Sequence, residues 1–192
     1  MSEAITKTQE DKTVFGFWIY LMTDCVLFAS LFATFIVLRG NTFGGPAGNE
    51  IFSMPYVLVE TLLLLISSFT CGLGLLAAYR KDKSQTLLWF GATFLLGLAF
   101  LGMEINEFSN LVSEGHSWRT SAFLSAFFTL VGTHGLHISI GLGWIAFLMA
   151  RIRSQGITKI NLKRLTLLSL FWHFLDIVWI FIFTIVFLVG EL

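Results

Sequence analysis

The chain of 192 residues is 56% hydrophobic and only 12% charged, and it contains 21 Phe and 6 Trp. Soluble domains carry roughly 25% charged residues, so this composition is typical of a protein whose solvent is lipid. The formal net charge is zero, which excludes the electrostatic attraction that a nucleic-acid partner requires.

Five apolar runs along the chain are long enough to cross a bilayer. A helix needs about 20 residues to cross roughly 30 Å of hydrocarbon. We therefore predict an all-α polytopic membrane bundle in which residues 1–13 form a cytoplasmic N-terminal segment and residues 14–192 form the five-helix domain. The predicted spans are 14–38, 57–79, 87–109, 121–150 and 165–189.

The connections between these runs carry helix breakers and charges. The first holds Gly44, Gly45, Pro46, Gly48 and Pro55, the second Arg80, Lys81, Asp82 and Lys83, the third Glu114, Gly115 and His116, and the fourth Arg151, Arg153, Lys159, Lys163 and Arg164. Ten of the twelve Lys and Arg lie in the N-terminal segment and in the second and fourth connections. Because basic loops stay inside the cell, the N-terminus should be cytoplasmic and the C-terminus periplasmic.

Eight ionisable side chains, none of them Lys or Arg, lie inside the predicted spans. They are Asp24, Glu60, Glu104, Glu107, His134, His137, His173 and Asp176. A charged group at the membrane centre costs at least about 2.5 kcal/mol, so each should face protein or water. Helix rise places Asp24, His134 and Asp176 near the midplane, His137 and His173 in the cytoplasmic half, and the three Glu in the outer half. These layers predict a buried polar network that links helices.

Three pairs of these residues are spaced i, i+3 and so share a helix face: Glu104 with Glu107, His134 with His137, and His173 with Asp176. A di-iron centre is disfavoured because no helix carries Glu-x-x-His. A haem between His137 and His173 and a proton path through the acids both stay open beside a purely structural network. A free-standing membrane b-type cytochrome or a proton-conducting channel is therefore the alternative function.

Four segments resemble subunit III of the haem–copper terminal oxidases. They are FGFWIYLMTDCVLFASLFATF at 15–35, GMEINEF at 102–108, FFTLVGTHGLHISIG at 127–141 and LFWHFLDIVWIFIF at 170–183. Two more segments, GGPAGNEIF at 44–52 and VLVETLLLLISS at 57–68, are most similar to the bacterial quinol-oxidase branch of the cytochrome bo type. The resemblance covers nearly the whole chain from Phe15 onward.

The resemblance implies a non-catalytic subunit of a respiratory quinol oxidase in the bacterial inner membrane. In that family haem and copper reside in subunit I, which reduces oxygen to water and pumps protons, so this chain should hold no catalytic, cofactor-binding or metal-binding residue. It would pack with subunits I, II and IV of a ubiquinol oxidase, bind structural phospholipid and support proton uptake. The haem interpretation of the three span histidines becomes much weaker.

The family motifs match this chain residue by residue. Asp24 stands where many relatives have a buried Glu, Glu104 and Glu107 match paired acids, His134 and His137 match Gly-x-His-Gly-x-His, and His173 and Asp176 match Trp-His-Phe-x-Asp. Arg151 falls where relatives present an arginine to a phospholipid headgroup, and Arg153 is a second headgroup candidate. Many relatives have two further N-terminal helices that form a wall of a lipid-filled cleft, whereas this sequence begins at the equivalent of the third.

Overall fold

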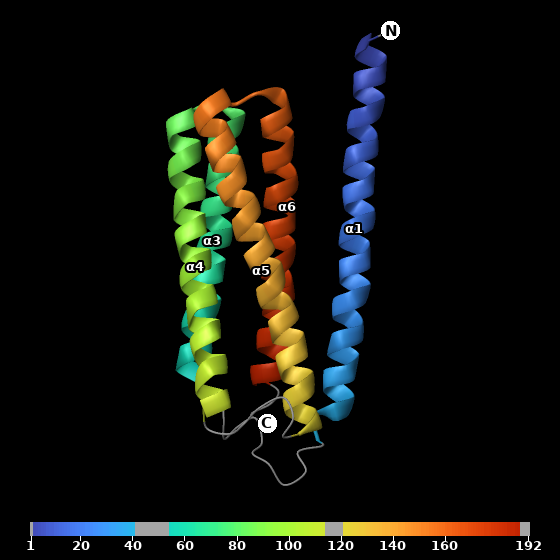
Figure 1. Cartoon of the computed structure of the whole chain (residues 1–192), viewed down its shortest axis with the longest axis vertical. Helices are drawn as coiled ribbons and strands as arrows, with labels where there is room; N and C mark the ends of the chain where they lie inside the picture. The colour runs from blue at the N-terminus through green and yellow to red at the C-terminus, as the bar shows by residue number, and fades with distance from the viewer. Residues whose placement is uncertain (1, 41–53, 114–120, 189–192) are drawn as a thin grey trace.

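Long helices make up most of the computed structural model, which describes residues 2–40, 54–113 and 121–188 (Figure 1). The helices are α1 (Ser2–Leu38), α3 (Met54–Tyr79), α4 (Lys83–Ser113), α5 (Ala122–Gln155) and α6 (Lys159–Ile182), and α6 continues into the π-helical segment η1 (Phe183–Leu188). Five of these stretches are long and apolar enough to span a membrane, the last being α6 with η1. The all-α class and the five predicted spans are therefore confirmed.

Most helices extend beyond the apolar runs that predicted them, because polar side chains cap their ends. Ser121 Oγ accepts the Leu124 amide at the start of α5, and Thr158 Oγ1 accepts the Asn161 amide at the start of α6. Asp82 Oδ1 accepts the Gln85 amide where α4 begins. Such caps satisfy amides that have no partner inside the helix, so the helix can begin in polar sequence.

Two predicted connections are shorter than the sequence suggested. Pro55 lies in the first turn of α3 rather than in the connection before it, where its missing amide costs no helical hydrogen bond. The basic residues assigned to the fourth connection lie on the ends of α5 and α6, because the turn between these helices spans only residues 156–158. Gly44, Gly45, Pro46, Gly48, Glu114, Gly115 and His116 lie outside the described residues.

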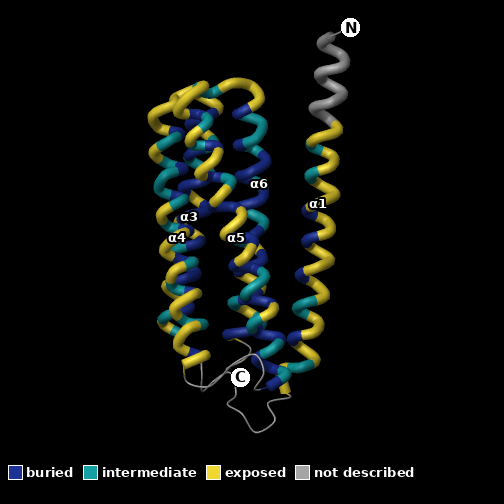
Figure 2. The backbone as a smooth tube through the Cα atoms, viewed as in Figure 1, coloured by how far each residue is buried: buried dark blue, intermediate teal, exposed yellow. Residues whose placement is uncertain are grey.

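Helices α3, α4, α5 and α6 form a four-helix bundle, and α1 packs on its outside. In the bundle α3 contacts α4 and α6, and α5 contacts the other faces of α4 and α6. Helix α1 contacts α5 and, over a smaller area, α6. Figure 2 shows buried positions concentrated in the bundle, while the described part of α1 is mostly exposed. The helix at the edge therefore depends on few contacts within this chain.

Trp172 on α6 is one of two fully buried tryptophans in the bundle core, and it meets three other helices. It is 1% exposed and donates its indole N–H to Ser67 Oγ on α3 at 3.1 Å. A Cβ added at Gly97 on α4 or at Gly141 on α5 would come within 2.9 Å of its ring. The two glycines are therefore needed for close approach, as small residues commonly are between membrane helices.

Candidate functional site

The eight ionisable span residues lie at three different helix interfaces and in one aromatic enclosure. Asp24, Glu60, Glu104, His134 and His137 are buried, while Glu107, His173 and Asp176 are half-buried. Asp24 meets His137 between α1 and α5, the three glutamates gather between α3 and α4, and His173 meets Ser68 between α6 and α3. His134 lies among aromatic rings. Each group has its own chemistry.

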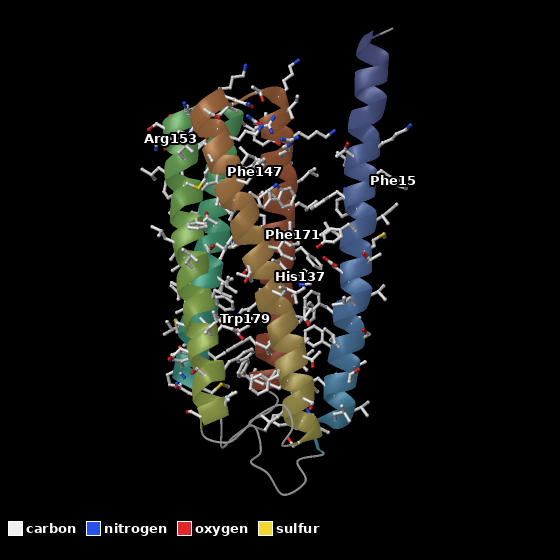
Figure 3. All side chains as sticks on the ribbon, in the orientation of Figure 1. Phe15, His137, Phe147, Arg153, Phe171 and Trp179 are labelled. Atoms are coloured by element: carbon white, nitrogen blue, oxygen red, sulfur yellow. The ribbon has the colours of Figure 1, made fainter. Side chains whose placement is uncertain are left out.

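The first group joins α1 to the bundle. Asp24 Oδ2 lies 3.7 Å from His137 Nε2, and His137 Nδ1 lies 2.7 Å from the Thr133 carbonyl oxygen. Because a carbonyl only accepts, Nδ1 must carry a proton and donate it. The other nitrogen, Nε2, then faces Asp24 Oδ2 at a distance longer than that of a hydrogen bond. Figure 3 shows His137 on the side of the bundle that faces α1.

The second group consists of Glu60 on α3 with Glu104 and Glu107 on α4. These carboxyl groups are close enough to interact electrostatically. Within the part of the chain that the structure describes, neither oxygen of Glu60 nor of Glu104 has a hydrogen-bond partner. Buried like charges repel, so this arrangement favours carboxyl groups that share or keep protons over three separate carboxylates.

His134 is fully buried among three aromatic rings. Its ring stacks on Trp179 with the centroids 5.3 Å apart, and Phe100 and Phe28 meet it edge-on. Neither ring nitrogen has a hydrogen-bond partner among the described residues. An enclosure of this kind favours the neutral imidazole, which packs here as one more aromatic ring.

The third group lies on the outer side of the bundle between α3 and α6. Ser68 Oγ lies 2.6 Å from His173 Nδ1, and the Asp176 carboxylate interacts with both Ser68 and His173. The three residues line an open pocket of about 390 Å³. Ser68 and His173 therefore connect α3 to α6 beside this pocket.

Hydroxyl groups of α3 form interhelical hydrogen bonds that the pattern of ionisable residues did not predict. Trp179 donates to Thr61 Oγ1 at 3.1 Å, and Thr70 Oγ1 lies 2.9 Å from Thr93 Oγ1 on α4. Ser67 Oγ donates to the Thr93 carbonyl at 3.3 Å. The sequence does show these hydroxyl side chains, since one apolar run contains Thr61, Ser67, Ser68 and Thr70. They could not be assigned to interhelical bonds from the sequence, because hydroxyls in membrane helices often bond only their own backbone.

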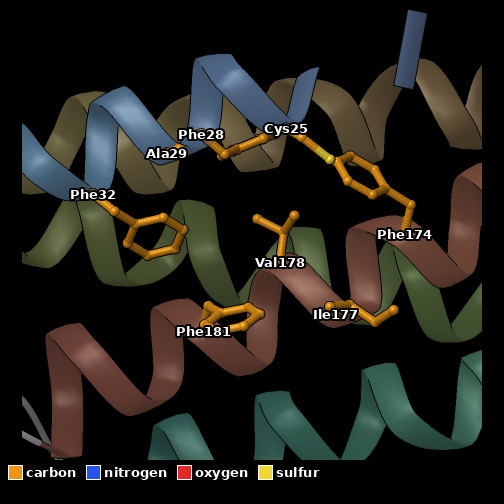
Figure 4. A pocket seen from close by; sticks show the side chains of 8 residues that line it. All are labelled: Cys25, Phe28, Ala29, Phe32, Phe174, Ile177, Val178 and Phe181. Atoms are coloured by element: carbon orange, nitrogen blue, oxygen red, sulfur yellow. The ribbon is translucent and has the colours of Figure 1, made fainter. Parts of the chain in front are cut away.

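An apolar groove of about 280 Å³ separates part of α1 from α6 (Figure 4). Cys25, Phe28 and Phe32 line it from α1, and Phe174, Ile177 and Phe181 line it from α6. Figure 4 shows the rings of Phe32 and Phe181 and the Cys25 thiol directed into this space. Such a lining suits a hydrocarbon chain and offers nothing to a polar ligand.

The two headgroup candidates lie at the end of α5 where the chain turns into α6. Arg151 donates from Nε to Gln155 Oε1 at 3.1 Å, and the carbonyl of Arg153 accepts from Lys83 Nζ at 2.9 Å. Figure 3 shows Arg153 at the upper end of the bundle, where α5 turns into α6. The Arg151 side chain is half-buried at this end, and the Arg153 side chain is exposed.

The histidines do not share one site. His137 faces α1, whereas His173 faces α3, so the two do not flank a common haem position. Among the residues that the structure describes, no three His, Cys, Asp or Glu are arranged to hold a metal ion. The geometry instead ties helices together in pairs.

Comparisons with known proteins agree over nearly the whole length. A family model described as cytochrome c oxidase subunit III matches residues 2–191. The chain is 62% identical over 180 residues to the cytochrome bo(3) ubiquinol oxidase subunit 3 of Pseudomonas aeruginosa, covering 94% of this chain and 86% of that protein. It is 50% identical to the cytochrome c oxidase subunit 3 of Bacillus sp. (strain PS3), covering 95% and 89%, and 48% identical to the quinol oxidase subunit 3 of Bacillus subtilis, covering 92% and 87%.

Proposed function

Because the chain belongs to the cytochrome c oxidase subunit III family, we propose that it is the non-catalytic subunit III of a bacterial quinol oxidase of the cytochrome bo type. It is a multi-pass protein of the bacterial inner membrane. Its partners are other oxidase subunits. The finer proposal is that haem and copper reside in subunit I, that subunits II and IV complete the assembly, and that this chain stabilises the catalytic subunit.

The observation that carries this proposal is the 62% identity to a ubiquinol oxidase subunit 3 over 94% of the chain. The arrangement of the polar groups supports it. Asp24 with His137 and Ser68 with His173 each connect two helices, as a stabilising subunit requires. The complex as a whole would oxidise ubiquinol, reduce oxygen to water and translocate protons.

We further propose that this subunit binds structural phospholipid. The apolar groove between α1 and α6 would hold an acyl chain, and Arg151 and Arg153 would bind anionic headgroups at about 1 kcal/mol per charge. The basic residues at this end of the bundle, where α3, α5 and their neighbours α4 and α6 meet near Arg153, support a cytoplasmic position for it. Buried acids such as Asp24 and Glu104 would support proton uptake by the catalytic subunit.

A difference spectrum tests the proposal. The assembly is purified from native membranes through a tag on this chain, and its reduced-minus-oxidised visible spectrum is compared with that of the chain expressed alone. We expect haem bands in the assembly and none in the isolated chain. Haem bands in the isolated chain would contradict the proposal and make His134, His137 and His173 candidate ligands.

A further inference from the structure

The pocket between α3 and α6 has polar side chains in its lining, although it lies at the depth of the hydrocarbon core of the membrane. Ser68 is the fifteenth of the 26 residues of its span, and His173 is the fifteenth of 30. At a rise of about 1.5 Å per residue, both lie about 16–23 Å from either end of their spans. Lipid headgroups stay outside the hydrocarbon core, so none can reach these side chains.

The polar groups of the pocket are incompletely satisfied within this chain. His173 and Asp176 are half-buried, and both line the open pocket with Ser68. Asp176 Oδ1 has no hydrogen-bond partner among the described residues but is enclosed by this chain, so the polar surface open to a partner is the exposed part of the His173 and Asp176 side chains. Exposing such a group to acyl chains is costly, so an ionisable residue at this depth faces protein or water.

The rim of the pocket has the shape and chemistry of a helix-packing surface. Leu65 and Phe69 flank it and are 41% and 68% exposed. Gly72 forms part of its lining, and a Cβ added there would meet no heavy atom within 4 Å. A small residue between exposed apolar ones allows the backbone of another membrane helix to approach closely.

We propose that this α3–α6 pocket is the docking site for a membrane-spanning helix of another oxidase subunit, and that this helix places a hydrogen-bond donor against His173 and Asp176. An acyl chain would fill the volume but place hydrocarbon against the exposed part of His173 and Asp176. A helix that carries Ser, Thr, Asn, Gln, Trp or a basic residue at mid-span fills the volume and satisfies the polar groups together. This inference rests on the proposed function, since the partner must be an oxidase subunit.

Photo-crosslinking in the intact oxidase tests the site. The photoreactive amino acid p-benzoyl-phenylalanine replaces Gly72, and in a matched control it replaces Gly143 on α5, which also has open space around it and lies inside a span. Each variant is irradiated in native membranes, purified through a tag on this chain, and analysed by mass spectrometry. We expect position 72 to crosslink to a membrane-spanning peptide of one oxidase subunit with a donor residue nearby, at a yield several-fold above position 143.

The possible failures are distinguishable. If the oxidase copurifies and position 72 yields only lipid adducts, or no more protein adduct than position 143, the docking site is wrong while the proposed function stands. If a crosslinked helix carries no donor near mid-span, the polar part of the inference is wrong. If no oxidase copurifies with the wild-type chain, both the proposed function and the docking site fall.

Substitutions of Asp176 test the hydrogen bond itself. Asp176→Leu removes the acceptor, whereas Asp176→Asn keeps the shape and one carbonyl acceptor. We expect Asp176→Leu to weaken retention of this subunit during detergent washing by about threefold, and Asp176→Asn to restore most of it. Equal retention of wild type and Asp176→Leu would overturn a bonding role for the carboxylate.

Discussion

Single residues in this protein act mainly by completing contacts between helices. His137 donates from Nδ1 to the Thr133 carbonyl and presents Nε2 to Asp24 at 3.7 Å, so the imidazole connects α5 to α1. The cost of burying ionisable groups in a membrane predicted which residues would turn inward. It could not predict their partners, because Ser68 and His173 are 105 positions apart in sequence and meet only through packing.

The contact between Asp24 and His137 gives a prediction at this scale. Asp24→Ala leaves Nε2 of His137 without its partner, and we expect it to destabilise the docking of α1 by about 1 kcal/mol. The measurement is the amount of this chain retained by the purified oxidase, together with the apparent melting temperature. Met22→Ala, two residues away at a side chain that is 67% exposed, should leave both unchanged. Full retention and an unshifted melting temperature in Asp24→Ala would show that the pair does not stabilise α1.

The number of membrane-spanning helices in the described residues could be predicted from the sequence, but their end points and their contacts with one another could not. Apolar runs identified all five, because only continuous hydrophobic sequence can cross the bilayer. Their ends were misplaced where caps such as Asp82 and Thr158 let helices begin in polar sequence. The sequence also showed small residues along α5, but not that Gly141 on α5 and Gly97 on α4 both face Trp172.

The close approach to Trp172 gives a prediction at the scale of helix packing. A Cβ at Gly141 would lie 2.9 Å from Trp172 Cζ3, and this ring is buried and closely packed on several sides. We expect Gly141→Ala to lower the stability of the purified oxidase by about 1–3 kcal/mol. Gly143→Ala, where a Cβ meets nothing within 4 Å, should be neutral or slightly stabilising because alanine favours helix. Similar unfolding curves for the two variants would contradict this account of the core.

The whole molecule is a four-helix bundle with α1 on its outer face (Figure 1). The class of fold followed from composition and span count, and the predicted orientation followed from basic residues. The order in which the helices pack did not follow from the sequence, because it depends on which helix faces contact each other. Basic groups at the ends of α3, α4, α5 and α6 should lie in the cytoplasm, and the opposite ends should face the periplasm.

Cysteine labelling in spheroplasts tests this orientation. Ser154 and Ser113 are both exposed and lie near opposite ends of the bundle. We expect Ser113→Cys to react with a membrane-impermeant maleimide in intact spheroplasts and Ser154→Cys to react only after lysis. The unsubstituted chain is the control, since Cys25 and Cys71 lie inside spans. The reverse pattern of labelling would invert the orientation.

The central claim is that this chain works as a subunit of a quinol oxidase, and ubiquinol-dependent oxygen uptake tests it most directly. The measurement is made on the assembly purified from native membranes through a tag on this chain, and on the chain expressed alone. We predict that the assembly contains haem and consumes oxygen when ubiquinol is supplied, and that the chain expressed alone consumes none. An assembly that contains this chain at full occupancy but neither oxidises ubiquinol nor consumes oxygen would contradict it.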